Sequence, residues 1–555
     1  MELLCLSDNL LVLVLALVVT ASSLLYLFTT NHVHSTTPKP ALLPPEPYGG
    51  LPIIGHLHQL LSSKKTLARA LADMADSHGP IFTIRLGLLR AVVVSDPETV
   101  HECFAGGHLD RALASRPKSS NAECLTYNYA GLGAAPYGTY WRDIRKVAVT
   151  QLLSSHRLKS LRHVQISEID MLMKELHHVS QSQSQSQSRG VAGISELLEQ
   201  LACNTITRLI AGKRYFNYKG GGRGSEEGER IGGLIKEFMR ICTDFVPSDF
   251  IPLLGWMNWF PGSLKSMKRV AAELDKVLQG WIEERKQLRN GTGGASGGEE
   301  QSAFIDVMLS AVGDDFAHHF SPDTIIKATS LVIKWCMQTL ILGGVDTTSI
   351  TMTWIISNLL NNRRAMELAQ QELDAKVGRN RVVEHSDIDS LVYLQAIVKE
   401  TMRLYPAAPT GLPHQALEDC TIHGYHVPKG ARVFANLWKL HRDPNVWHDP
   451  DEFKPERYLA EQVEDHENEN LVDLLSAKNY ELIPFGLGRR SCPGNAFALQ
   501  VVHLTVARIL QGFQISNATM VPVDMTEGLG LTMPKATPLE VKLAPRLPLY
   551  LYQVC

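Results

Sequence analysis

The hydrophobic pattern begins with an uninterrupted apolar segment. Leu10–Phe28 contains 19 residues without a charge. As a helix this segment is about 28 Å long, close to the thickness of the hydrocarbon core of a bilayer. A cleaved signal peptide is the alternative, but Glu2 and Asp8 precede the run where such a peptide carries Lys or Arg. The run also exceeds the usual apolar core of a signal peptide. We therefore expect an uncleaved membrane anchor within residues 1–30.

A proline-rich stretch follows the apolar segment. Residues 31–56 include Pro44, Pro45, Pro47 and Pro52, which favour a stiff, extended backbone. This pattern predicts a hinge over 31–56. The hinge is expected to hold one globular domain, residues 57–555, at a set angle to the membrane.

Most of the remaining chain has helical periodicity. Strand patterns are concentrated at 81–95, which reads as a hairpin, and at 420–436, where short strands alternate with Gly and Pro turns. The predicted class is mainly α with a small β portion. The stretches 180–188, 220–228 and 290–300 are polar or Gly-rich, and we expect disordered surface loops there because they can bury little.

One predicted helix is unusually long and apolar. It begins at a Ser321 cap and continues to about Leu360. A second membrane span is the alternative, but Lys334, Asp346 and the glycine pair at 343–344 interrupt the apolar pattern. A helix that is apolar on all sides is more often threaded through a large core. We expect a central helix with a local break near 343–344.

Composition and charge exclude several functions. The formal net charge is -3 and 20% of residues are charged, so no basic surface for nucleic acid is expected. The nine cysteines are scattered singly, with no C-x-x-C pair. This distribution argues against a disulfide framework and indicates a domain that faces a reducing compartment.

Cys492 stands out among these cysteines because of its neighbours in PFGLGRRSCPG (484–494). No Cys or His lies near enough in sequence to complete a zinc site. A dinucleotide-binding loop is disfavoured because Ser491 occupies the place of the third glycine. A buried structural cysteine remains the alternative. The glycines, however, allow backbone N–H groups to approach the sulfur, and such hydrogen bonds stabilise a metal-bound thiolate. Arg490 can pair with a carboxylate of a bound group, and Phe485 can cover that group, as a thiolate ligand of haem iron requires.

The same stretch resembles the haem-binding signature of the cytochrome P-450 monooxygenases, F-x-x-G-x-R-x-C-x-G. Phe485, Gly488, Arg490, Cys492 and Gly494 match every fixed position. The resemblance implies that Cys492 is the metal ligand and that the other four residues bind the cofactor. It also implies the cytochrome P-450 fold, in which a long central helix crosses the domain.

Other family motifs follow in the expected order. GGVDTT (343–348) resembles the oxygen-activating stretch of the central helix, with Asp346 as the acid and Thr347 as the alcohol. The alternative is a structural pair, with Asp346 in a salt bridge and the Thr347 hydroxyl bonded to its own helix. KETMRLYP supplies the E-x-x-R pair Glu400 and Arg403, and FKPERY supplies Arg457. In the family these three charges form a buried structural network.

The resemblance also implies residues that hold the haem propionates. WRDIRK matches the helix whose tryptophan and arginine reach them, here Trp141 and Arg145. LPHQALEDC places His414 at a second propionate position. Arg142, Lys146 and Arg489 are candidates for a basic surface that docks an electron donor, although solvated charges explain them nearly as well.

The resemblance extends from the hinge to the C-terminal region and includes plant enzymes of specialised metabolism. It implies haem b as cofactor and O2 as co-substrate. Electrons would come from NADPH through NADPH–cytochrome P-450 reductase, because the chain has no flavin- or nicotinamide-binding module. The expected substrate is small and hydrophobic: a terpenoid, alkaloid, flavonoid or lignan. The pocket would be lined by 118–137, 340–348, 407–412 and 529–532.

The expected location is the endoplasmic reticulum membrane, with a single pass and a cytosolic catalytic domain. Two alternatives remain for the function. One is a haem-thiolate isomerase or dehydratase that does not activate oxygen, and the other is a non-catalytic haem protein.

Overall fold

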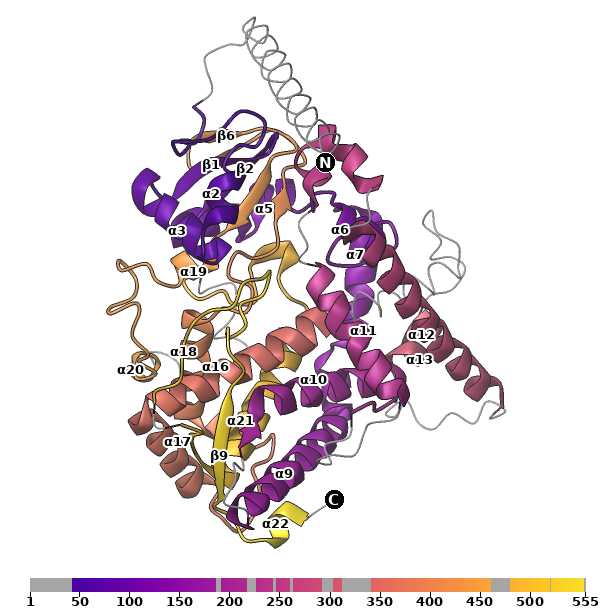
Figure 1. The fold of residues 1–555 in the computed structure, drawn as a ribbon, viewed down its shortest axis with the longest axis vertical. Coiled ribbons are helices and arrows are strands. Elements are labelled where there is room, and N and C mark those ends of the chain that lie inside the picture. The colour runs from indigo at the N-terminus through magenta and orange to yellow at the C-terminus, as the bar shows by residue number, and fades with distance from the viewer. Residues whose placement is uncertain are drawn as a thin grey trace, which may run out of the picture.

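Helices form most of the protein and surround three small sheets in the described residues (Figure 1). The computed structural model describes residues 42–185, 191–216, 226–242, 246–259, 263–291, 303–311, 341–460, 480–519 and 521–553. The α-helices are α2 (Leu57–Ser62), α3 (Leu67–His78), α4 (Pro97–Phe104), α5 (Gly107–Ala112), α6 (Ser120–Leu125), α7 (Thr139–Val147), α8 (Ser155–Ser160), α9 (Arg162–Gln185), α10 (Ile194–Ala211), α11 (Glu226–Cys242), α12 (Ser263–Gly291), α13 (Phe304–Ala311), α16 (Thr347–Asn361), α17 (Arg363–Lys376), α18 (Val392–Leu404), α19 (Leu437–Leu440), α20 (Arg457–Ala460), α21 (Asn495–Gly512) and α22 (Tyr550–Gln553).

Shorter helical turns and strands complete the fold. The π-helical turns are η1 (Ala148–Leu152) and η6 (Ile341–Asp346), and the 3-10 turns are η2 (Pro247–Asp249), η3 (Pro252–Trp259), η7 (Ile388–Ser390) and η10 (Gly488–Arg490). The strands are β1 (Ile81–Leu86), β2 (Leu89–Val94), β3 (Ala192–Gly193), β4 (His414–Gln415), β5 (Cys420–Ile422), β6 (Tyr425–Val427), β7 (Arg432–Ala435), β8 (Phe513–Asn517) and β9 (Glu540–Pro545). The expectation of a mainly α protein with a small β portion is confirmed.

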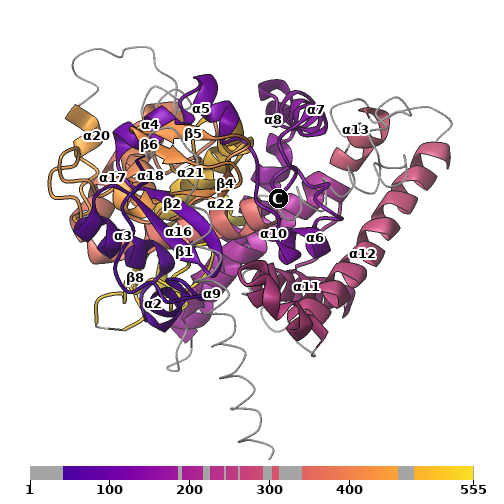
Figure 2. The ribbon, with the colours of Figure 1, turned by 90° about the horizontal axis from the view of Figure 1, so that it is seen from above.

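The strands and the helices are distributed unevenly over the molecule. In Figure 1, strands β1 and β2 lie with α2 and α3 at one end, and α11, α12 and α13 lie along the opposite side. Figure 2 keeps the same separation after a 90° turn, with α12 far from the strands. Helix α16 lies between the two parts, which places its length in the interior.

The largest sheet has the order β1-β2-β7-β4. Strands β1 and β2 form the predicted antiparallel hairpin, with Ile81 opposite Val94. Strand β7 then joins β2 in parallel, and β4 joins β7 in antiparallel fashion with His414 opposite Val433. The predicted strands at 420–436 are β5, β6 and β7. The sheet thereby brings His414 from a distant part of the sequence to the segment at 113–116.

The described part of the central helix consists of η6 and α16. Every side chain from Thr348 to Leu360 is buried, against α10, α17, α18 and α21. The helix ends at Asn361, close to the predicted end, and the predicted break takes the form of the π-helical turn η6. The predicted helix start at Ser321 lies outside the described residues.

The second half of the predicted hinge packs on the sheet. The backbone N–H of Thr83 in β1 donates to the carbonyl of Pro45 (2.8 Å), and His56 Nε2 lies 2.9 Å from the carbonyl of Pro47. Gly55 has a φ of +58°, and a Cβ there would lie 2.3 Å from the carbonyl oxygen of Arg85. The chain can approach β1 this closely because the residue is glycine.

The prediction of a disordered loop at 180–188 is wrong for its first part. Helix α9 continues to Gln185, so Ser180–Gln185 is helical. Glutamine is a good helix former, and the Ser180 hydroxyl donates to the carbonyl of His177 within the helix (2.7 Å). Helices α11 and α12 likewise extend two or three residues into the other two predicted loops. The remaining loop residues lie outside the described ranges.

None of the helices in the described ranges is both long and apolar enough to cross a membrane. The predicted anchor at Leu10–Phe28 lies outside these ranges, so the structure does not test it.

Three hydrophobic clusters meet near Cys492. The first is built by α9, α10, α16, α17, α18, α21 and the β8–β9 pair, and contains Leu499. The second joins α7, α10, α12 and α13 and contains Phe497, while the third lies under β2 and β7 and contains Leu487. The segment that carries Cys492 is therefore anchored in three parts of the core.

Candidate functional site

Cys492 lies in a tight loop between η10 and α21. Its backbone N–H donates to the carbonyl of Phe485 (2.8 Å), and the N–H of Gly494 donates to its sulfur (3.4 Å). Gly488 has a φ of +71°, and a Cβ there would lie 2.2 Å from the carbonyl oxygen of Phe104. The loop conformation therefore requires glycine at 488.

The environment of the Cys492 sulfur suits a metal ligand. Burial raises the pKa of the thiol, whereas the Gly494 N–H and the positive charge of Arg145 act in the opposite direction. Backbone N–H groups that point at a cysteine sulfur stabilise its thiolate when a metal binds. In the described part of the chain no three His, Cys, Asp or Glu side chains gather as a metal site.

Two predicted arginines lie beside this loop. Arg145 on α7 donates through one terminal nitrogen to the Ser491 carbonyl (2.9 Å) and hydroxyl (3.2 Å). Arg490 donates to the carbonyls of Ala114 (2.6 Å) and Ala135 (2.6 Å), and to that of Leu132 (3.2 Å). Backbone carbonyls carry only partial charge, so both guanidinium groups retain capacity for an anion.

Trp141 and His414 join the same group. The Trp141 indole donates to the Leu132 carbonyl (3.0 Å), and its ring lies under the guanidinium groups of Arg490 (4.3 Å) and Arg145 (5.5 Å). The His414 ring nitrogen Nδ1 lies 2.8 Å from the Leu113 carbonyl. The structure thus brings Trp141, Arg145, His414, Arg490 and the Cys492 loop together.

Sequence reasoning missed Arg116, which belongs to this cluster. Its guanidinium donates to the carbonyls of Leu412 (2.7 Å) and Pro413 (2.9 Å), the two residues before His414. Its charge lowers the pKa values of both His414 and Arg490. The basic side chains at 111, 116 and 118 look alike in sequence, so no signal there separates Arg116 from the others.

In the described residues this cluster of positive charges has no carboxylate ion-pair partner. Burial, with the charges of Arg116 and Arg145, lowers the pKa of Arg490 to about 8, and burial lowers that of Arg116 to about 10. Burial is also the main cause that holds the pKa of His414 well below its ordinary value. Across the described ranges, no carboxylate forms an ion pair with Arg116, Arg145 or Arg490. Buried cations without carboxylates fit a ligand that carries carboxylates of its own, as the two propionates of haem do.

In a second buried group of charges, the arginines are paired with a carboxylate. Glu400 on α18 accepts from Arg403 (2.8 and 2.9 Å) and from Arg457 (3.1 Å), and also from the backbone N–H of Lys454 (2.9 Å). The predicted network of Glu400, Arg403 and Arg457 is present, and the side chains of Glu400 and Arg403 are fully buried. We call these three residues the balanced network.

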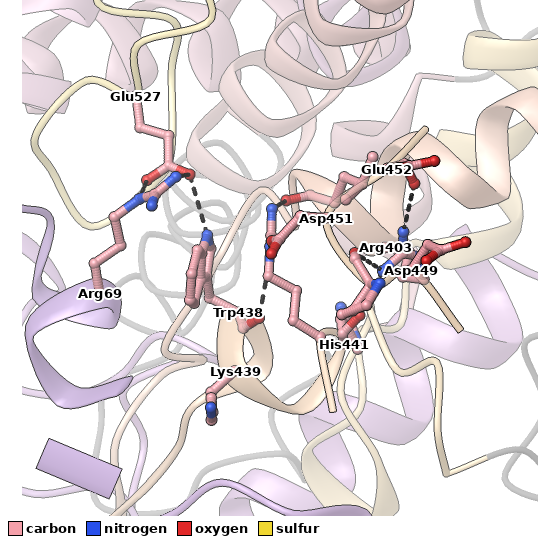
Figure 3. A network of polar contacts seen from close by, with 12 residues as sticks. Arg69, Arg403, Trp438, Lys439, His441, Asp449, Asp451, Glu452 and Glu527 are labelled. Atoms are coloured by element: carbon pink, nitrogen blue, oxygen red, sulfur yellow. Dashed lines mark hydrogen bonds and ion pairs between the residues drawn. The ribbon is translucent and has the colours of Figure 1, made fainter. Parts of the chain in front are cut away.

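The balanced network is connected through His441, which sequence reasoning missed, to the segment that precedes the Cys492 loop. Figure 3 shows Arg403 beside His441. Arg403 donates to the His441 carbonyl (2.8 Å), and the His441 ring nitrogen Nε2 accepts from the backbone N–H of Ile483 (3.1 Å). Burial and the charges of Arg403 and Arg442 lower the pKa of His441 to about 3. The ring is therefore neutral at physiological pH and can accept this hydrogen bond.

Asp346 and Thr347 lie at the junction of η6 and α16. The hydroxyl of Thr532 donates to Asp346 Oδ2 (2.7 Å). Burial raises the pKa of Asp346 to about 6, and the charge of Glu199 acts in the same direction. Within the described ranges Asp346 forms no salt bridge.

The three basic residues considered for a docking surface differ in their contacts. Arg142 and Lys146 are exposed on α7. Arg489 is paired with Asp110 (3.2 Å), whose carboxylate also accepts the Arg489 backbone N–H (3.0 Å). Arg489 therefore helps to fix the loop next to Cys492.

Comparisons with known proteins identify the family. The Cytochrome P450 family matches residues 44–541. A cytochrome P450 of Trigonella foenum-graecum is 48% identical over 504 residues, covering 91% of each chain. A xanthotoxin 5-hydroxylase of Arabidopsis thaliana is 43% identical over 95% of this chain and 98% of the relative. A nicotine N-demethylase of Nicotiana tomentosiformis is 42% identical over 92% of this chain and 94% of the relative.

A solved structure shows the same fold. A zebrafish cytochrome P450 crystallised with progesterone superposes with a TM-score of 0.70 at 25% identity, covering 87% of this chain and 100% of that chain. The chain belongs to the cytochrome P450 family and is a monooxygenase similar to plant enzymes of specialised metabolism.

Proposed function

We propose that the protein holds haem b through the Cys492 thiolate and inserts one oxygen atom from O2 into a small hydrophobic plant metabolite. The observation that carries this proposal is the Cys492 loop beside Arg116, Arg145 and Arg490, three cations without a carboxylate partner in the described residues. When bound, haem supplies an iron atom at which O2 is activated. Side chains of the protein bind and orient the cofactor, limit the access of water and supply protons.

The chain's own residues have distinct tasks in this proposal. Cys492 is the single protein ligand, and the Gly494 N–H stabilises its negative charge. Arg116, Arg145, Arg490, His414 and Trp141 orient the cofactor through its propionates. Phe485 packs beside the loop and limits access of water.

Proton supply is the proposed task of Asp346 and Thr347. A pKa of about 6 allows the Asp346 carboxyl group to hold and release a proton near neutral pH. The Thr347 hydroxyl, one residue further along the helix, can pass that proton on. Enzymes of this fold that do not activate oxygen have no need for such a pair.

The substrate class is inferred from the pocket segments and the relatives. Thr410 and Thr532 line a small cavity together with Pro409, Gly530 and Met533, so two of the four predicted pocket segments meet. The hydroxyls of Tyr127 and Tyr129 are bonded to Asp275 and to the Ser119 carbonyl.

The names of related plant enzymes refer to xanthotoxin, nicotine, vinorine and flavonoids. We infer a substrate with a compact ring system, for which terpenoids, alkaloids, flavonoids and lignans are the candidates.

The first experiment is a reduced, carbon-monoxide difference spectrum of the full chain, of Cys492→Ser and of Cys124→Ser. The parent and Cys124→Ser are expected to show the long-wavelength Soret band of a thiolate-bound haem, and Cys492→Ser to lack it. Absence of the band in the folded parent protein would remove the thiolate assignment.

The second experiment separates the monooxygenase from its alternatives. With NADPH, reductase and a converted substrate, product should form in proportion to NADPH and O2 consumed. Asp346→Asn and Thr347→Ala are expected to lower product per NADPH at least about tenfold, because positioned proton transfer typically contributes about 100-fold or more to a rate. Product without NADPH would indicate an isomerase or dehydratase, and haem binding without turnover of any candidate class would indicate a non-catalytic protein.

The membrane anchor and the reductase are part of the same proposal. We expect deletion of residues 1–30 to release the protein from microsomes, because Leu10–Phe28 is the proposed single span. The proposed location is the endoplasmic reticulum membrane with the catalytic domain in the cytosol, where NADPH–cytochrome P-450 reductase can reach it. Arg142 and Lys146 are the exposed basic residues that could contact the reductase.

A further inference from the structure

A short hairpin near the C-terminus extends to the central helix. The backbone N–H of Gly528 donates to the Pro534 carbonyl (2.7 Å), and that of Ala536 donates to the Thr526 carbonyl (2.8 Å). Glu527 pairs with Lys535 as an isolated bridge between the two arms. Residues 529–533 therefore form the tip of this hairpin, which we call the 526–536 hairpin.

The tip is fixed by two hydrogen bonds to the backbone of Met533, one at its N–H and one at its carbonyl. The N–H of Met533 donates to the Ala407 carbonyl (3.0 Å), and its carbonyl accepts from the indole of Trp354 (2.8 Å). Trp354 is fully buried on α16 and stacks on Tyr405 at 4.0 Å between ring centroids. Thr532, the preceding residue, is therefore held in place relative to α16.

The base of the hairpin is fixed by Glu527, whose side chain is only 3% exposed. Arg69 on α3 donates to both carboxylate oxygens (2.7 and 2.9 Å), and the Trp438 indole donates to one of them (3.1 Å), as Figure 3 shows. Arg69 and Trp438 come from segments far apart in the sequence. The hairpin is thus tied at both ends to the body of the protein.

From this geometry we propose that Thr532 is a positioning residue for the Asp346 carboxyl group. The Thr532 hydroxyl donates to Asp346 Oδ2 (2.7 Å) across 186 residues of sequence. The hydrogen bond fixes the direction of the carboxyl group and favours its ionised form. This inference rests on the proposed proton-supplying function of Asp346.

The charges around Asp346 agree with this assignment. Burial raises its pKa, the Thr532 hydroxyl opposes that shift, and Glu199 on α10, which packs against η6, adds to it. Glu199 is the other charged group that acts on Asp346 in the described residues. Loss of the Thr532 hydroxyl should therefore raise the pKa of Asp346 further.

The test compares Thr532→Val, which removes the hydroxyl at nearly constant shape, with Thr532→Ser, which keeps it. Infrared spectra of the full-length, haem-loaded protein are recorded against pH, with Asp346→Asn as the blank that identifies the Asp346 carboxyl band. In Thr532→Val the midpoint of that band should rise by about one pH unit, the size expected for a hydrogen bond to a charged group. Thr532→Ser should remain at the parent midpoint. The share of NADPH that yields product should fall in Thr532→Val and recover in Thr532→Ser.

The outcomes separate this inference from the proposed function. An unchanged band midpoint and frequency in folded Thr532→Val would overturn the positioning role, even if Asp346→Asn uncouples the enzyme. Normal coupling in Asp346→Asn would instead overturn the proton-supplying function, while the infrared shift would still decide whether Thr532 positions the carboxyl group. If Thr532→Val does not fold, Thr532→Ala is measured in the same way.

Discussion

Two groups of buried or half-buried arginines contact the region around Cys492, and they differ in how their charge is compensated. In the balanced network, Glu400 accepts from both Arg403 and Arg457. In the other group, Arg116, Arg145 and Arg490 are bonded to backbone carbonyls and a hydroxyl, without a carboxylate in the described residues. Ion pairs that are complete within the protein serve its stability. Cations that lack a partner indicate where a ligand with negative charge binds.

The largest effect is expected when the negative charge of Glu400 is removed from the balanced network. Glu400→Gln leaves Arg403 and Arg457 buried without a countercharge, which costs about 3–5 kcal/mol of the free energy of unfolding. The variant should accumulate little folded haem protein, measured by yield and thermal unfolding. Glu540→Gln on the exposed face of β9 is the control and should unfold within about 0.5 kcal/mol of the parent. A stable Glu400→Gln would contradict the structural role of the network.

Asp346 extends the comparison to a single buried acid. Its folded-state pKa of about 6 lies above the ordinary value of 3.8, so the folded state binds the proton more tightly. The free energy of unfolding should therefore fall as pH rises from about 4 to about 6, by up to about 3 kcal/mol from this group. Asp346→Asn should remove that part of the pH dependence, whereas the exposed control Asp389→Asn should keep it. Chemical denaturation at several pH values measures both.

His441 allows a test of the contact between the balanced network and the segment that leads to Cys492. His441→Ala leaves the buried N–H of Ile483 without its acceptor and should destabilise the protein by about 2 kcal/mol. His441→Gln offers a carbonyl oxygen in the same region and should recover part of that loss. Thermal unfolding of both variants measures the change in stability. Equal stability of His441→Ala and the parent would show that the hydrogen bond between Ile483 and His441 does not stabilise the protein.

The smallest effect on stability is expected in the unbalanced group. Arg116→Gln removes one of several crowded positive charges while it loses hydrogen bonds to Leu412 and Pro413, so the two effects largely cancel to within about 1 kcal/mol. Haem retention should suffer instead: transfer of haem to apomyoglobin should accelerate about tenfold. Exposed Arg111→Gln is the matched control. A loss of stability comparable with that of Glu400→Gln, without faster haem transfer, would show that Arg116 stabilises the fold and does not bind haem.

Sequence reasoning found the residues whose spacing is local. The Cys492 loop, the Glu400–Arg403 pair and the Trp141–Arg145 pair each lie within one turn or one helix, so their relation is set by backbone geometry. It missed Arg116, His441 and the partner of Asp346. Their contacts join segments that are 42 to 297 residues apart, and no local pattern distinguishes them from exposed neighbours.

The sequence by itself determined the class of fold, the family, the candidate cysteine ligand and the break in the central helix. These follow from periodicity and from motifs in which a few adjacent residues carry the chemistry. Only the tertiary structure decided which buried charges are balanced, which hydroxyl reaches Asp346, and that Ser180–Gln185 is helical. The physical reason is that compensation of a buried charge depends on every group within a few ångströms in space, and the chain folds those groups together from distant positions.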